Sequence, residues 1–380
     1  MLGLILIILG PGAGPRTRAD RPPKPAPIFP LETAWSLPLS SPPVAEPTLD
    51  AGQAYIALTE GALWAVDRDN GDRNWSIQAD ATIAPIAADF RVLVSGSSSV
   101  VAVSAASGDE LWRVPLPAPA TAHAIAGDLL VAATTGGVLL AIDLEQGSER
   151  WRRRLPASLM SGLAVATGWL AVSDDTGRVH AVDTASGTVR WSRSFSGSLS
   201  PPAVTADRVF VGSTTNRFWA LRSSDGATIW QWRTGADVVG AATDGDLVYL
   251  LTLDNLVRAL DVRSGNQRWK ATLSTRPDAP PFLHGGVVIV SGVAPRIDGF
   301  DQTTGASLGS LIPISELAGP PAMSLTLQPF RTAMVAAAHD GRLLAYRPER
   351  LMLRDAVLAP LTALPGRRLT PDQIPAAGQK

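Results

Sequence analysis

The stretch Ala181-Val182-Asp183-Thr184-Ala185-Ser186-Gly187-Thr188-Val189-Arg190-Trp191 carries the pattern that decides the fold. An alternating strand ends in Ala-x-Asp, Gly follows four residues after the Asp, and Trp follows four residues after the Gly. Three other copies match this frame, A-x-D-x-x-x-G-x-x-x-W, at every fixed position, and they begin at Ala65, Ala141 and Ala259. One short unit is therefore used repeatedly along the chain.

Degenerate copies extend the repeat and define its period. Two copies have Ser104 and Arg222 in place of Asp, and a seventh, with Asp301, has Gly309 in place of Trp. The glycines of the frame follow one another at intervals of 37, 39, 40, 39, 39 and 40 residues, at Gly71, Gly108, Gly147, Gly187, Gly226, Gly265 and Gly305. Each unit of about 39 residues reads as four short strands, and residues 207–211 and 246–250 are typical second strands. Four strands at this period predict a β-propeller.

The ends of the repeat predict the number of blades. After Ala345-Tyr346-Arg347 the frame has neither its Gly nor its Trp, so the last unit lacks an outer strand. Near the start, Trp35 lies in an outer-strand sequence that no Ala-x-Asp strand precedes. The distance from Trp35 to Arg347 is 312 residues, or eight periods of 39. We therefore expect an all-β, eight-bladed propeller of four-stranded antiparallel blades, closed by an N-terminal strand that leaves no open sheet edge in the ring.

The chain divides into one domain and three flanking segments. Residues 31–350 form the propeller. Residues 1–14 are apolar and resemble an export signal that lacks the usual positively charged leader, and the apolar run is too short to span a bilayer. Residues 15–30 are rich in Pro and predict an extended linker. Residues 351–380 predict a C-terminal extension that is partly disordered.

Composition excludes several function classes. The net charge is −1, from 33 basic and 34 acidic residues, which gives no attraction to nucleic acid or to an anionic membrane. The chain has no Cys, so disulfides, thiolate metal sites and cysteine nucleophiles are excluded. A membrane contact, if present, is therefore expected to be peripheral.

The repeated frame resembles the tryptophan-docking motif A-x-D-x-x-T-G-x-x-x-W of the quinoprotein-dehydrogenase-like eight-bladed propellers, which have PQQ-like repeats. The resemblance covers about residues 31 to 350 and implies that each frame Trp lies between neighbouring blades. The residues in this structural role are Trp35, Trp75, Trp112, Trp151, Trp191, Trp230 and Trp269. Within the superfamily, the short repeats resemble the BamB family of outer-membrane barrel assembly factors more than the longer dehydrogenases, which bind the quinone PQQ.

Two tryptophans lie outside the docking position at equivalent places. Trp64 and Trp219 each precede the Asp position of their repeat by three residues. Packing between blades is the simpler interpretation, and an aromatic contact with a partner is the alternative.

The innermost strands should carry the chemistry of an enzyme of this fold, namely a carboxylate base and oxygen ligands for calcium. We expect these strands at Pro42-Pro43-Val44, Ala84-Pro85-Ile86, Ala122-His123-Ala124, Ser161-Gly162-Leu163, Pro201-Pro202-Ala203, Val239-Gly240-Ala241, Pro280-Pro281-Phe282 and Pro320-Pro321-Ala322. None of these segments contains Asp or Glu. The sequence thus predicts no catalytic, cofactor-binding or metal-binding residue, and no cofactor.

Four other features have plain structural interpretations. The run from Gly305 to Gly309 fits the nucleophile pattern G-x-S-x-G but falls in a repeat turn where a helix should follow. The acidic loop from Asp67 to Asp72 lacks the ligand spacing of a calcium loop. The four histidines lie in different blades, and His123 is expected to be a hydrogen-bonded filler. The arginines at 150 and 152–154 should line a solvated outer strand.

These observations favour a non-enzymatic, exported scaffold, periplasmic or associated with the cell envelope, that resembles the BamB type and binds a partner protein as a monomer. A propeller that binds PQQ or another small ligand as an enzyme is one alternative. An exported propeller that binds carbohydrate or an unrelated protein is the other.

Overall fold

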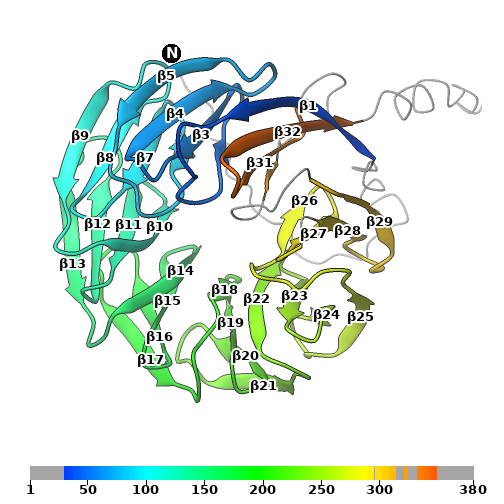
Figure 1. The fold of residues 1–380 in the computed structure, drawn as a ribbon. Helices are drawn as coiled ribbons and strands as arrows, with labels where there is room; N and C mark the ends of the chain where they lie inside the picture. The colour runs from blue at the N-terminus through cyan, green and yellow to red at the C-terminus, as the bar shows by residue number, and fades with distance from the viewer. Residues whose placement is uncertain (1–29, 295, 314–320, 324–331, 349–380) are drawn as a thin grey trace, which may run out of the picture.

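The fold was analysed in a computed structural model, which describes residues 30–294, 296–313, 321–323 and 332–348. Over these ranges every regular element is a β-strand. The strands form eight four-stranded antiparallel sheets, arranged as a ring (Figure 1). The eight-bladed all-β propeller predicted from the repeat is therefore confirmed. Residues 1–14, 15–29 and 351–380, for which a signal-like segment, a linker and an extension were predicted, lie outside the described residues.

Blades 1 to 4 follow the chain from residue 48, and each blade is listed from its innermost to its outermost strand. Blade 1 comprises β2 (Thr48–Leu49), β3 (Gln53–Ala57), β4 (Ala62–Asp67) and β5 (Arg73–Gln78). Blade 2 comprises β6 (Ile86–Ala88), β7 (Arg91–Ser95), β8 (Ser99–Ser104) and β9 (Glu110–Pro115). Blade 3 comprises β10 (Ala120–Ala126), β11 (Leu129–Thr134), β12 (Val138–Asp143) and β13 (Glu149–Arg154). Blade 4 comprises β14 (Leu159–Ala166), β15 (Trp169–Asp174), β16 (Arg178–Asp183) and β17 (Val189–Ser194).

Blades 5 to 8 complete the ring. Blade 5 comprises β18 (Ala203–Val204), β19 (Arg208–Ser213), β20 (Arg217–Arg222) and β21 (Thr228–Arg233). Blade 6 comprises β22 (Val238–Thr243), β23 (Leu247–Thr252), β24 (Leu256–Asp261) and β25 (Gln267–Thr272). Blade 7 comprises β26 (Phe282–His284), β27 (Val287–Ser291), β28 (Ile297–Asp301) and β29 (Ser307–Leu311). Blade 8 comprises β30 (Ala322–Met323), β31 (Met334–Ala338), β32 (Arg342–Pro348) and β1 (Leu31–Pro38).

The hydrophobic core is divided among the contacts between blades. Each of the eight buried clusters found in the described residues joins one blade to the next. Strand β11 shows why: Leu130 and Ala132 belong to the cluster with blade 2, and Val131 and Ala133 belong to the cluster with blade 4. Successive side chains of a strand point to opposite faces, so an apolar strand serves two neighbours. No blade buries its core alone, and the ring folds as one unit.

The ring closes where the two ends of the domain meet. Strand β1 pairs antiparallel with β32, from Leu31 opposite Pro348 to Pro38 opposite Arg342 (Figure 1). An ion pair between Glu32 and Arg347, with Oε1 and Nε at 2.8 Å, supports this pairing. The prediction that an N-terminal strand supplies the missing outer strand of the last blade is confirmed.

Across the described ranges, no helix combines the length and apolar character needed to cross a bilayer.

Candidate functional site

The frame tryptophans lie between neighbouring blades. Each indole Nε1 donates a hydrogen bond of 2.7 to 3.1 Å to a backbone carbonyl of the next blade. The pairs are Trp35 with Arg68, Trp75 with Ala105, Trp112 with Leu144, Trp151 with Thr184, Trp191 with Ser223, Trp230 with Val262 and Trp269 with Gln302. This repeated contact fixes the spacing between the blades that it joins.

The frame glycines lie directly against these indole rings. Their φ angles run from +64° to +83°, in the left-handed region that favours glycine. A Cβ atom at any of the seven positions would lie only 2.4 to 2.9 Å from the neighbouring Trp side chain. Glycine is therefore required both for the turn and for the space that the indole occupies.

The Asp of the frame shapes the same turn. Oδ1 of Asp183 accepts hydrogen bonds from the backbone N–H groups of Ala185 and Ser186, both at 3.1 Å. Its Oδ2 accepts a hydrogen bond of 2.9 Å from Arg190, seven residues further on. The pairs Asp143 with Arg150 and Asp261 with Arg268 repeat this spacing. The frame is thus explained by turn geometry and blade contact.

The two tryptophans with a predicted partner contact are largely buried. Trp64 and Trp219 are each 7% exposed, and they lie in the clusters between blades 8 and 1 and between blades 4 and 5. The guanidinium of Arg73 stacks on Trp64, and the ring of Phe195 packs on Trp219. Both indoles therefore pack between blades, and contact with a partner remains a prediction for them.

The segments that resembled other chemistry form parts of the repeat. Gly305 faces Trp269, and Ser307 begins strand β29 where a nucleophile elbow would need a helix. In the acidic loop, Oδ1 of Asp67 accepts bonds from the N–H groups of Asp69 and Asn70, as in the other frame turns. Among the described residues, no group of three or more His, Asp and Glu is placed to hold a metal ion.

The arginine cluster on β13 is paired within the outer part of the ring. Arg150 bonds to Asp143 and Arg152 bonds to Glu149, while Arg153 donates to the carbonyl of Gly187 on the next blade. Three of the four predicted cations thus already have acceptors.

A buried His and Asp pair in blade 4 was not predicted. His180 Nε2 lies 3.0 Å from Asp174 Oδ2, and His180 Nδ1 lies 2.7 Å from the hydroxyl of Ser192. Burial disfavours the Asp174 carboxylate, but hydrogen bonds from His180, Thr176 and the Arg178 N–H outweigh it and lower the pKa of Asp174. Every polar atom of the pair is satisfied, as polar groups between blades must be.

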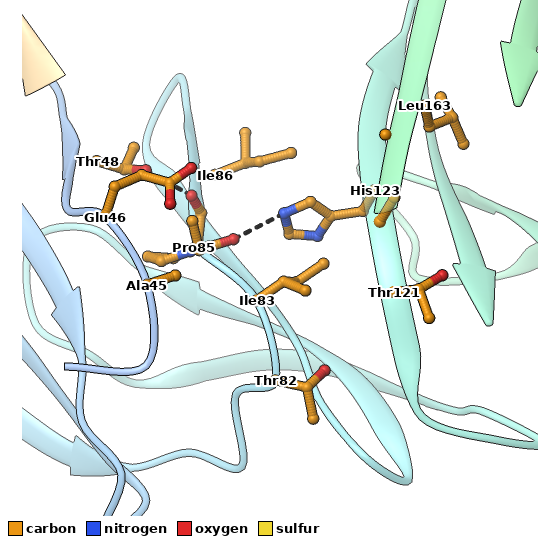
Figure 2. A pocket seen from close by; sticks show the side chains of 13 residues that line it. Ala45, Glu46, Thr48, Thr82, Ile83, Pro85, Ile86, Thr121, His123 and Leu163 are labelled. Carbon is orange, nitrogen blue, oxygen red and sulfur yellow. Dashed lines mark hydrogen bonds between the residues drawn. The ribbon is translucent and has the colours of Figure 1, made fainter. Parts of the chain in front are cut away.

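The inner side of the ring contains a cavity of about 490 Å³. Its walls come from the beginnings of the innermost strands of blades 1 to 4 and the loops before them (Figure 2). The polar lining residues are Glu46, Thr48, Thr82, Thr121 and His123. Apolar side chains, including Ile83, Ile86 and Leu163, form the rest of the wall. This size is within the range of small-molecule sites in proteins.

His123 is held in the cavity wall as a neutral ring. Its Nε2–H donates to the carbonyl of Ala84 at 2.9 Å, and its Nδ1 accepts from the hydroxyl of Ser95 at 2.7 Å. Figure 2 shows the ring pointing across toward the strand of Ile86. Burial lowers the pKa of His123 to about 4, against the opposing effect of the Ala84 bond. The histidine predicted to be a hydrogen-bonded filler has this geometry.

Glu46 is the residue that the sequence did not identify. The first inner strand was expected at Pro42-Pro43-Val44, but the structure places β2 at Thr48–Leu49, and only an isolated bridge joins Pro43 to Leu58. Glu46 therefore precedes the strand and lines the cavity. The expected segment of blade 1 itself contains no carboxylate, but the strand begins several residues later, and the loop between the two contributes Glu46 to the cavity.

The fold and the docking contacts define the class of the protein, a quinoprotein-like eight-bladed propeller whose blades are joined by tryptophans. A family model described as outer membrane protein assembly factor BamB matches residues 32–98, 96–161 and 136–349. These matches cover nearly the whole ring, and the chain belongs to this family.

Individual proteins show more distant similarity. The outer membrane protein assembly factor BamB of Burkholderia pseudomallei (strain K96243) is 30% identical over 128 residues, which is 33% of this chain and 32% of that protein. The chain thus matches about a third of the length of this relative. The crystal structure of BamB from Moraxella catarrhalis has a TM-score of 0.60 at 18% identity, and the match covers 84% of this chain and 98% of that one. The computationally designed Ika8 protein has a TM-score of 0.71 at 14% identity, with 82% and 98% covered. At these identities the two structures support the fold alone.

Proposed function

We propose that the protein is a non-enzymatic scaffold in the assembly of outer-membrane proteins, exported to the periplasm or the cell envelope, where it holds a partner protein on the loops of its ring. The observation that carries this proposal is the family match over residues 32–349. The name of the Burkholderia relative, an outer membrane protein assembly factor, supports the same process. Association with the membrane would then be peripheral, through the partner.

The rigid ring supports this mode of action. Seven repeated Trp contacts and eight clusters between blades fix the loops before a partner arrives. Preformed loops lose little conformational entropy on binding, so more of the contact energy appears as affinity. We expect one chain to act as a monomer in this role.

The rival function, an enzyme that uses PQQ, is disfavoured by the lining of the cavity. PQQ is a polycarboxylate quinone, and a site for it needs cationic side chains. Among the described residues, the cavity wall contains neither Arg nor Lys, and its ionisable residues there are Glu46 and the neutral His123. The residues present do not fit this cofactor.

The test is affinity purification of the tagged chain from chemically crosslinked native envelopes, followed by mass spectrometry. The same tag on an unrelated exported protein is the control. Enrichment of a large outer-membrane barrel protein over this control is the expected result. Recovery of carbohydrate, or of soluble proteins alone, would contradict the proposal and favour the other exported-propeller interpretation.

A further inference from the structure

Three of the hydrogen-bond donors in the cavity wall are already used inside the protein. Thr48 donates to the carbonyl of Pro85 at 2.6 Å, and Thr82 donates to the carbonyl of Ala120 at 2.9 Å. The Nε2–H of His123 donates to the carbonyl of Ala84. The hydroxyl of Thr121 is enclosed and has no partner. While these bonds persist, the wall offers acceptors to a ligand, because the hydroxyl oxygens keep only their lone pairs.

Glu46 is the strongest of these acceptors. Its side chain is half-buried, and in the described part of the chain no hydrogen bond or ion pair involves its carboxylate. Figure 2 shows the carboxylate beside Thr48 and Ile86, above the Pro85 segment. No Arg or Lys of the described ranges lines the cavity, and His123 stays neutral above its pKa of about 4. The site is therefore negatively charged, and an uncompensated, partly buried carboxylate favours a cationic hydrogen-bond donor.

The remaining wall suits an aliphatic chain. Ile83, Ile86 and Leu163 give it an apolar surface. A lysine side chain combines these requirements, because its ammonium has three donors and no acceptor and its stem is four methylene groups long. A guanidinium can also pair with one carboxylate through two parallel N–H donors, but it is planar and wider than an ammonium, and its stem has three methylene groups instead of four.

We propose that this cavity binds an ammonium group on an aliphatic stem, with Glu46 as the residue that accepts its hydrogen bonds, and that the occupant is a lysine side chain on a loop of the partner protein. The assignment of the occupant rests on the proposed scaffold function. The ammonium specificity rests on the cavity alone, so the two can fail separately.

The first experiment uses dansylcadaverine, a fluorescent probe with a primary ammonium on a five-carbon stem. We expect saturable binding to the full chain and roughly tenfold or greater weakening in Glu46→Gln, because a charge-assisted hydrogen bond is lost. The N-acetylated probe has the same stem without the charge. It should bind to the unchanged protein about as weakly as the charged probe binds to Glu46→Gln. Glu46→Gln should fold normally, since the carboxylate supports no contact within the protein, and circular dichroism checks this.

The matched control is Glu60→Gln. Glu60 lies in the β3–β4 turn of the same blade, is exposed, and bonds to Ser40 outside the cavity. This variant removes the same charge from blade 1 and should bind the probe as well as the unchanged protein does. The ammonium site would be overturned if Glu46→Gln and Glu60→Gln bound the charged probe with equal affinity. It would also be overturned if the unchanged protein bound the acetylated and the charged probe with equal affinity.

The second experiment repeats the crosslinked purification with both variants. Loss of the partner in Glu46→Gln but not in Glu60→Gln supports the lysine occupant. If the partner is recovered equally with both variants, the lysine occupant is wrong while the scaffold function stands. If neither the variants nor the unchanged chain recover a barrel protein, the scaffold function and its lysine occupant both fail, while probe binding still decides the ammonium site.

Discussion

The indole of Trp151 lies so close to Gly187 that a Cβ atom on the glycine would be 2.5 Å from Cε3 of the ring. The same indole donates from Nε1 to the carbonyl of Thr184 at 2.7 Å. Blade 3 therefore contacts blade 4 through the side chain of Trp151. This contact needs a backbone carbonyl of blade 4 at the right position to accept the hydrogen bond, and a neighbouring residue of blade 4 without a Cβ atom. This contact, repeated around the ring, can be tested at single positions.

Gly187→Ala should destabilise the protein by roughly 2–4 kcal/mol. The new methyl group meets the indole, and alanine is strained at the φ of +66° found there. Gly127→Ala is the matched control, because Gly127 has the same φ of +66° but nothing within 4 Å of the added Cβ. Urea unfolding of the two variants should show a loss of only about 1 kcal/mol in the control. Equal losses would mean that the indole contact adds nothing beyond backbone strain.

The neutral His123 should make the protein less stable in mild acid. Its pKa is lowered to about 4 in the folded protein, against about 6.5 in the unfolded chain, so the unfolded state binds more protons between these values. The associated stability is fully present above pH 6.5, and roughly 3 kcal/mol is lost as the pH falls to 4. Unfolding free energies measured from pH 7.5 to 4 should therefore decline.

His123→Gln tests the assignment of this decline. Glutamine keeps a donor for the Ala84 carbonyl but does not titrate, so the slope between pH 6.5 and 4 should become shallower. A residual slope is expected from His284, whose pKa is also lowered by burial. An unchanged slope in the variant would show that other groups cause the decline.

A second pH effect should appear in a lower range. The hydrogen bond from Arg268, followed by that from the Ser264 N–H, lowers the pKa of Asp261. A depressed carboxyl pKa contributes stability above its unfolded value of about 3.9, and this contribution is lost as the pH falls below it. Asp261→Asn should be less stable than the unchanged protein at pH 7, and the difference should be clearly smaller at pH 2, because part of the carboxylate's contribution is lost below its unfolded pKa. Thermal unfolding at both pH values measures the difference, and a constant gap would argue against the carboxylate pair.

The contact between blades 7 and 8 should be the weakest in the ring. Strand β29 carries Gly309 where the other outer strands of the described ring carry the docking Trp. One indole hydrogen bond and its packing are therefore missing, and the cluster around Met334 and Ile289 holds the two blades together. Hydrogen exchange should be roughly tenfold faster in β28 and β31 than in β15 and β16. Faster exchange in blade 4 would refute this ranking.

The sequence predicted the ring well because the fold depends on contacts that repeat. The frame Gly and Trp each meet a partner about one period away, so Gly187 and Trp191 report contacts between blades directly, while Asp183 reports the turn between them. The closure of the ring could also be predicted from the sequence. No Ala-x-Asp strand precedes Trp35, so its strand could only complete the last blade. These positions carry little information about ligands, because their side chains make the contacts that join the blades.

The cavity was harder to predict from the sequence, for a physical reason. Its wall is built from loops that precede the inner strands, where prolines remove N–H donors and no periodicity indicates where pairing begins. Glu46 lies between Pro43 and Thr48 in such a loop, a few residues after the segment where the strand was expected, and so was not identified as a lining residue. The link between His180 and Asp174 was missed similarly, because a turn brings the two side chains together across a hairpin.

The pairing of β1 with β32 also sets the order in which the molecule can be completed. Glu32 and Arg347, which meet in this last blade, are 315 positions apart in the chain. During synthesis β1 is made long before its partner β32. Until β32 has been made, the backbone N–H and C=O groups of β1 lack their partner strand. A nascent chain with such a delayed partner is exposed to premature pairing with other strands. The synthesis of β32, and not the folding of any single blade, is thus the event that allows the chain to become a closed ring.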